Sequence, residues 1–170
     1  MPSRTDQIIS KTKGALKAVK ATARGLGGVF RTLMVQHGEA AALLQRAKAS
    51  PTKRIELWPD IRRELLSHER AEIRVLYPAL RDHPETRALA DHHDREASEL
   101  EALVERMHHV DPRSSVWADL LDDLIELVQH HVSEEESEIF PRGHEALGAA
   151  RSRALEDVFM AAKKAAMPSA

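Results

Sequence analysis

The chain has 170 residues, enough for one domain with a sizeable core. Its 25 Lys and Arg nearly balance 27 Asp and Glu, so the formal net charge of −2 gives no reason to expect nucleic acid as a partner. Cysteine is absent, which excludes disulfides, zinc–thiolate sites and iron–sulfur clusters. We find no apolar run that could span a membrane and no secretion signal, and we therefore expect a cytoplasmic protein.

The composition and the pattern of apolar residues predict an all-α protein. Leu and Ala are frequent, 31% of the residues are charged, and no stretch alternates apolar and polar residues as a strand does. Gly and Pro separate the helical segments, and Ser50-Pro51 supplies an N-cap and a first-turn Pro. Pro59 marks either a kink or the true start of that segment. The predicted helices cover about residues 5–24, 29–49, 51–78, 84–108, 115–141 and 149–166.

These segments predict an up-down-up-down four-helix bundle with additions at both ends, because four central helices are joined by short loops. The bundle would take residues 29–142. Residues 1–28 would form an extra basic amphipathic N-terminal helix, and residues 143–170 a short C-terminal helix and tail.

Ionisable residues occupy the apolar, core-facing stripe of several predicted helices. His37 lies at the centre of the first stripe, and the second and fourth stripes are continued by His68, Glu69, Glu72, His131 and Glu135. On the third bundle helix His93 lies close to the stripe and Glu96 somewhat to one side. His92 lies near the edge and is the rival assignment to His93.

Such a set of buried groups favours a metal site. Burying several carboxylates is costly unless a positive charge compensates, and a metal ion also favours deprotonated carboxylates and neutral imidazoles. A buried, hydrogen-bonded His–Glu network is the alternative, but three helices placing such groups at one level of the bundle make it the weaker interpretation.

An internal repeat supports the metal interpretation. His68, Glu72 and Tyr77-Pro78 recur at the same offsets as His131, Glu135 and Phe140-Pro141. A His and a Glu four residues apart lie on the same face of a helix and can bind one metal together. Two such units imply approximate two-fold symmetry around a pair of metals. We expect the Pro to weaken or end each helix.

At these residues the chain resembles the hemerythrin-like, HHE cation-binding family, over about residues 29–141. The resemblance implies a four-helix bundle that holds a di-iron centre with an oxo or hydroxo bridge. It assigns Glu72 and Glu135 as bridging carboxylates and Glu69 as an additional ligand or a hydrogen-bond acceptor for one. The terminal ligands would be His37, His68, His93 and His131. Apart from the resemblance, the place of Glu96 beside the apolar stripe makes it a candidate second donor on the third helix.

Two departures from that family bear on function. Ala97 follows His93 by four residues, where oxygen carriers have a second His, and the fourth-helix carboxylate Glu135 lies four rather than five residues after His131. A site richer in carboxylate and poorer in imidazole favours harder, more oxidised iron. We therefore expect sensing of oxygen or nitric oxide, or iron handling, rather than bulk oxygen transport. The alternatives are a di-iron enzyme acting on peroxide or oxygen, and a metal-free bundle that recruits a partner.

The remaining charged residues are expected to be mostly solvated. We read His130, Glu134 and Glu136 as exposed, and Glu138 as the acid nearest the stripe.

The basic N-terminal segment keeps an apolar heptad that includes Leu16 and Val19, and it predicts an extra helix packed on the bundle or extending its first helix. A homodimer contact through this heptad and binding to a membrane surface or nucleic acid are the alternatives.

Overall fold

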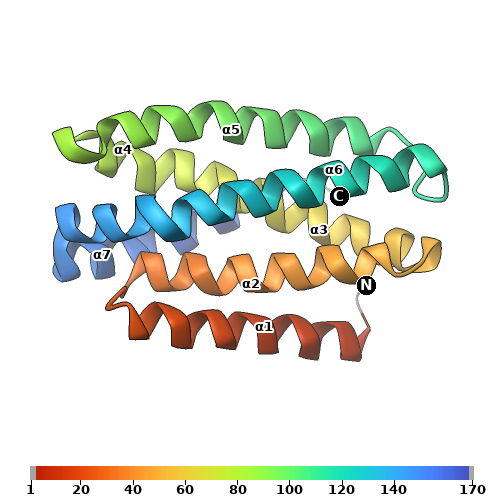
Figure 1. Ribbon diagram of the computed structural model, residues 1–170, viewed down its shortest axis with the longest axis horizontal. Helices are drawn as coiled ribbons and strands as arrows, with labels where there is room; N and C mark the ends of the chain where they lie inside the picture. The colour runs from red at the N-terminus through yellow and green to blue at the C-terminus, as the bar shows by residue number, and fades with distance from the viewer. Residues whose placement is uncertain (1–2, 169–170) are drawn as a thin grey trace.

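The computed structural model describes residues 3–168 and confirms the all-helical prediction, with no strand in that range. Figure 1 shows the long helices running side by side. Along the chain the helical elements, with η marking a π-helical turn, are α1 (Arg4–Ala23), α2 (Val29–Lys48), α3 (Pro51–Ala71), η1 (Glu72–Leu76), α4 (Tyr77–Arg81), α5 (Pro84–His108), α6 (Ser115–Glu134), η2 (Glu135–Ile139) and α7 (Phe140–Ala165). None of the described helices is long and apolar enough to cross a membrane.

The bundle consists of α2, α3, α5 and α6 and has an apolar cluster at each end. One cluster includes Leu44, Trp58 and Trp117, and the other includes Phe30 and Phe140. The predicted ionisable residues fall between these two clusters along each helix. The bundle therefore sandwiches a polar layer between two apolar layers.

The prolines of the two repeats interrupt the α-helical pattern but do not end their helices, so of the two expected outcomes only the weakening is seen. The chain instead passes through one π-helical turn, η1 or η2, and stays helical beyond Pro78 and Pro141. A proline lacks the N–H of the α-helical ladder and clashes with the carbonyl four residues earlier. The widened turn accommodates this, and the N–H of the preceding aromatic residue bonds the carbonyl of Glu72 or Glu135.

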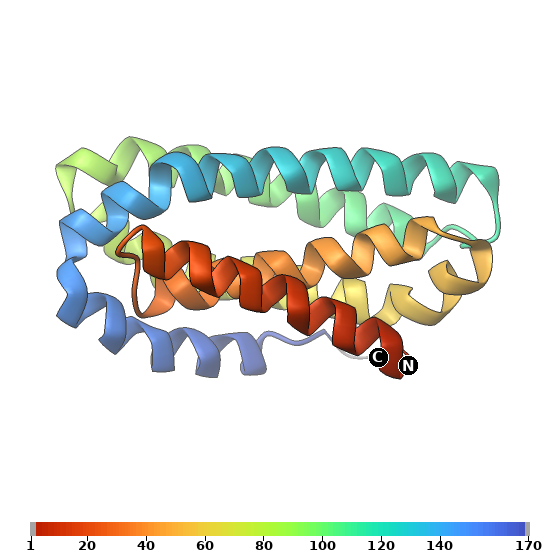
Figure 2. The same cartoon turned by 60° about the horizontal axis from the view of Figure 1, so that its bottom comes forward.

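Helix α1 is a separate helix packed along α2, which confirms the extra N-terminal helix (Figure 2). Helix α1 does not pack on the bundle through the apolar heptad, because Leu16 and Val19 are exposed and the buried face of α1 is made of small or polar residues. Gly38 shows why the residues facing α2 are small, since a Cβ at this position would lie 2.7 Å from the carbonyl oxygen of Lys13. The two backbones approach too closely for large side chains between them.

Helix α7 leaves the bundle axis and returns along its side (Figure 2). Its helical dihedrals break at Gly148, where φ is +74°, so the predicted final helix of residues 149–166 begins after this break. The returning part packs against α2 and α3. It therefore covers the middle of the bundle, where the polar layer lies.

Candidate metal centre

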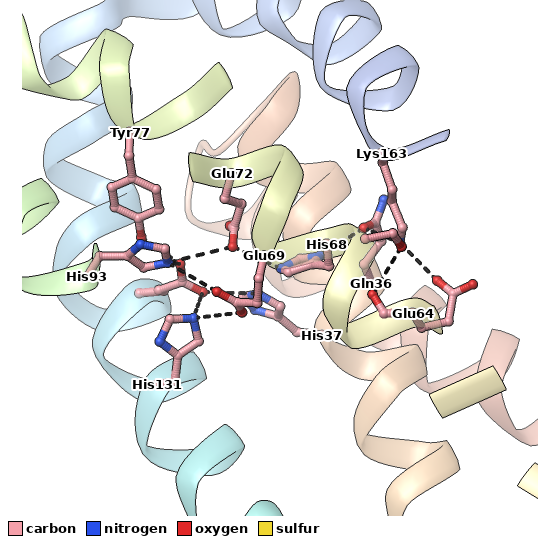
Figure 3. Close-up of polar contacts among 12 residues, drawn as sticks. Gln36, His37, Glu64, His68, Glu69, Glu72, Tyr77, His93, His131 and Lys163 are labelled. Atoms are coloured by element: carbon pink, nitrogen blue, oxygen red, sulfur yellow. Dashed lines mark hydrogen bonds and ion pairs between the residues drawn. The ribbon is translucent and has the colours of Figure 1, made fainter. Parts of the chain in front are cut away.

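The structure brings seven of the eight predicted site residues into one buried layer of the bundle (Figure 3). They form two groups of four, each able to offer one ligand atom per residue within 4.8 Å of the others. One group is His37, His68, Glu72 and Glu135, and the other is Glu69, Glu72, His93 and His131. Glu72 belongs to both groups, so the two groups adjoin.

Both repeated glutamates contact histidines from both halves of the chain. The Glu135 carboxylate lies 3.1 Å from His37 Nε2 and 3.5 Å from His93 Nε2. Glu72 Oε2 lies 3.3 Å from His68 Nε2 and 3.8 Å from His93 Nε2. Each carboxylate thus lies between two imidazoles, as a ligand shared by two cations would.

Many donor atoms of this layer are buried and lack a hydrogen-bond partner. These atoms include both oxygens of Glu72 and the Nε2 atoms of His37, His68, His93 and His131. Some lie close to opposite charges but without hydrogen-bond geometry. Native proteins rarely leave so many buried polar atoms unsatisfied. The donor set of imidazole nitrogens and carboxylate oxygens fits a transition-metal cation, which would satisfy them together.

The neighbours of the imidazoles orient three of the four histidines toward this layer. The Nδ1–H groups of His37, His68 and His131 donate to Glu136 (3.2 Å), Gln36 (2.9 Å) and Glu96 (3.2 Å), respectively. Lys163 Nζ also donates to this Gln36 atom, at 2.7 Å. Because an ammonium group can only donate, the atom is the side-chain oxygen, which accepts from His68 as well. Each Nε2 then faces the layer, an arrangement typical of metal-binding histidines.

Aromatic residues of the two repeats stack on histidines of the opposite half. The Tyr77 ring lies 3.5 Å from the His93 ring at an angle of 17°, and the Phe140 ring lies 5.6 Å from the His37 ring at 20°. The symmetry stops at the hydroxyl, because Tyr77 also donates a 2.6 Å hydrogen bond to Glu135. The predicted two-fold relation thus includes the aromatic rings that stack on His37 and His93.

Electrostatics separates the two equivalent glutamates. Burial and the charges of Glu135 and Glu69 raise the pKa of Glu72 well above its ordinary value. Burial alone would also raise the pKa of Glu135, but His131 and His37 outweigh it and hold that pKa well below the usual range. The two glutamates at equivalent positions of the repeat thus have pKa values shifted in opposite directions.

The imidazoles follow the same competition between burial and neighbouring charge. Burial would lower the pKa of His131, but Glu69 and Glu135 raise it well above its ordinary value. Burial, helped by nearby positive charge, lowers the pKa of His68 well below its ordinary value. The pKa values of these two imidazoles are therefore shifted in opposite directions by their different neighbours.

The structure separates the two rival histidines and relocates Glu96. His93 is buried in the layer, whereas His92 lies on the surface with Glu96 and Glu134. Glu96 lies outside both buried groups and accepts from His131. His130 is exposed, as expected.

Glu136 was wrongly expected to be solvated. It is buried, accepts from His37 and is bound by Lys17 Nζ, while Glu138 is exposed. The π-turn η2 begins at Glu135 and changes the facing of the residues after it, so an α-helical projection misplaces them. Pro141 follows this turn and disrupts the α-helical hydrogen bonds, so it is the residue from which the π-turn could have been predicted.

Comparison with known proteins agrees with the fold and the buried layer. Residues 28–142 match the model of the family described as "Hemerythrin HHE cation binding domain". The match covers most of the chain and includes every residue of both buried groups. The chain therefore belongs to the hemerythrin HHE cation-binding family, and its buried His and Glu clusters are consistent with a metal site.

One curated protein is similar to this chain but much longer than it. The protein named "DNA nickase" from Nostoc sp. (strain PCC 7120) is 29% identical over 136 residues, which cover 77% of this chain and 38% of that protein. This chain thus spans little more than a third of that relative's length. No solved structure matches the chain.

Proposed function

We propose that this protein holds a non-haem di-iron centre and uses it to sense oxygen or nitric oxide or to handle iron. The observation that carries the proposal is the pair of adjoining four-residue groups that share Glu72. A single cation would leave one group of buried donors without a charge partner, whereas two cations supply one for each.

The proposal assigns a role to each residue of the layer. Glu72 and Glu135 would bridge the two cations, and His37 and His68 would complete one site. His93, His131 and Glu69 would complete the other. When bound, the irons supply one-electron chemistry and an open coordination position for a small diatomic or peroxide ligand. The chain's own contribution is to exclude bulk water and to orient the imidazoles.

The lack of a second histidine after His93 supports sensing or iron handling over oxygen transport. Ala97 is buried at that position and offers no donor. Each group contains two imidazoles and two carboxylates, a donor set that favours the more oxidised metal. A carrier needs a reduced iron that binds oxygen reversibly, which such a donor set disfavours.

Metal analysis of protein produced with iron tests the proposal. We expect about two irons per chain, one for each group, with an absorption band in the near ultraviolet. Glu72→Gln should reduce the iron content, because it alters the residue common to both groups. Glu138→Gln, an exposed acid in η2, is the matched control and should leave the iron content unchanged. At most one tightly bound metal in the iron-loaded protein, with no such band, would contradict the proposal.

The hydroxyl of Tyr77 favours an enzyme as the second candidate. It donates to Glu135 inside the layer and could pass a proton to a bound ligand. Rapid turnover of hydrogen peroxide by the iron-loaded protein, lost in His68→Ala, would support a peroxide-consuming enzyme over a sensor. The same iron-loaded protein without turnover would favour the first candidate.

A further inference from the structure

A cavity of about 440 Å³ leads from the surface of the protein to the His/Glu layer. Its inner end is formed by four residues of that layer: His37, His68, Glu69 and His131. Its outer end carries Lys11 of α1 and Arg63 of α3, whereas Lys163 of α7 is buried further in, beside Gln36. The cavity therefore connects solvent with the proposed metal centre.

The walls of this cavity between its two ends are largely apolar. They include Ala40 and Leu43 of α2, Leu65 of α3, Leu100 of α5 and Val128 of α6. All five belong to, or pack against, the apolar cluster at one end of the bundle. A hydrocarbon chain lying along these walls would remove apolar surface from water, which favours binding.

The size of the cavity exceeds what a diatomic ligand needs. One water-sized molecule takes up about 30 Å³, whereas sites for small organic ligands commonly measure about 300–1,000 Å³. A cavity of about 440 Å³ lies within that second range. Its dimensions therefore suit an organic molecule next to the layer.

Two of the cations that line the cavity are each paired with an acid, so they do not select a highly charged ligand. Lys163 Nζ bonds Glu64 at 2.9 Å, and Arg63 is paired with Asp60. Figure 3 shows Lys163 between Glu64 and Gln36, next to His68. A ligand passing this mouth is best accommodated with most of its surface uncharged. A single oxygen-bearing end would be best placed at the inner end, where the polar groups converge.

We propose that this cavity binds a medium-length aliphatic molecule with one terminal oxygen group, a carboxylate or an alcohol. The chain lies along the apolar wall, and the oxygen end faces the His/Glu layer. The orientation of the oxygen end rests on the proposed metal centre, whereas binding of the chain depends only on the cavity.

Binding of octanoate and 1-octanol to the full chain, followed by calorimetry, tests this proposal. Both probes should bind saturably, and octanoate should bind about fourfold more tightly than heptanoate, the effect of one buried methylene. Loading with iron should strengthen octanoate relative to 1-octanol, because a carboxylate is the better ligand for a hard cation. No saturable binding of either probe would overturn the proposal.

Two neighbouring alanines of α2 provide a matched pair of variants. Ala40 lines the cavity, whereas Ala41 is exposed. Ala40→Leu should weaken octanoate binding by about tenfold or more, since the added carbons take the room of about three methylenes. Ala41→Leu should leave it unchanged. If Ala40→Leu fails to fold by circular dichroism, Val132→Phe fills the same cavity from α6. Unchanged octanoate binding in a folded filling variant would overturn the proposal.

Iron content, measured on the same samples, separates this inference from the proposed function. Tight octanoate binding without two irons would leave the cavity assignment standing and remove the metal centre. Two irons with no binding of either probe would do the reverse.

Discussion

Without metal, the buried polar groups of the candidate centre should lower the free energy of unfolding of the protein. The substitution Glu72→Leu measures this effect. Glu72 is fully buried, and neither of its oxygens has a hydrogen-bond partner. Burial and nearby carboxylates raise the pKa of Glu72, which favours its neutral form in the metal-free protein, so we expect the substitution to remove no strong ion pair. Leu is similar in size and removes the unsatisfied oxygens.

The size of the effect follows from those two oxygens. An unsatisfied buried polar group costs about 1–3 kcal/mol, so the metal-free variant should gain about 2 kcal/mol of unfolding free energy. For a chain of this length that gain corresponds to an increase in Tm of about 4–8 °C. With metal at a thousand times its Kd, the wild-type protein gains about 4 kcal/mol, which the variant should not. The order of stability should therefore reverse on metal loading.

Urea unfolding of both proteins, with and without anaerobic iron(II), measures this reversal. Glu138→Leu, at an exposed site of η2, is the control and should stay within about 0.5 kcal/mol of the wild type in both states. A metal-free Glu72→Leu protein that is less stable than the wild type would refute the reasoning. It would mean that Glu72 has a stabilising partner in the metal-free layer.

Three further predictions concern pH and packing. Metal affinity should fall as the pH is lowered, because Glu72 and His131, both with raised pKa values, must lose protons to bind; titrations with cobalt(II) at several pH values measure this. Asp6→Asn should cost about 1–2 kcal/mol at pH 7 in urea unfolding, because it removes the buried charge that pairs with Arg46 and Lys53, both of which are partly exposed. The pKa of Asp6 is depressed, so its contribution exists above the unfolded pKa of about 3.9, and the deficit should shrink as the pH falls below that value. Gly28→Ala should lower Tm by several degrees more than Gly27→Ala, because its Cβ would lie 2.3 Å from a backbone carbonyl oxygen of α7, whereas nothing lies within 4 Å at Gly27.

The fold and most of the site could be predicted because periodicity reports which face of a helix is buried. His37, His68 and His131 interrupt apolar stripes, and an α-helical projection placed each of them correctly in the buried layer. The same projection favoured His93 over His92, and the structure buries only His93. These are local properties of single helices, which a sequence encodes directly.

Other parts of the site depend on contacts between distant segments. Gln36 and Lys163 are separated by most of the chain, yet they meet beside His68 because α7 turns back after Gly148. No periodicity within one helix predicts such a contact. Glu136 was misplaced for a different reason, since the π-turn alters the angle per residue at the point where the projection is applied.

The repeat also explains why metal binding should stabilise the assembled bundle rather than one of its halves. The group of His37, His68 and Glu72 from the first half is completed by Glu135 from the second. The group of His93 and His131 from the second half is completed by Glu69 and Glu72 from the first. Neither half offers more than three residues to one group, so a cation bound by a separated half would lose at least one ligand. Because a cation that binds only the assembled layer adds its binding free energy to folding, the metal should stabilise the packing of the two halves against each other.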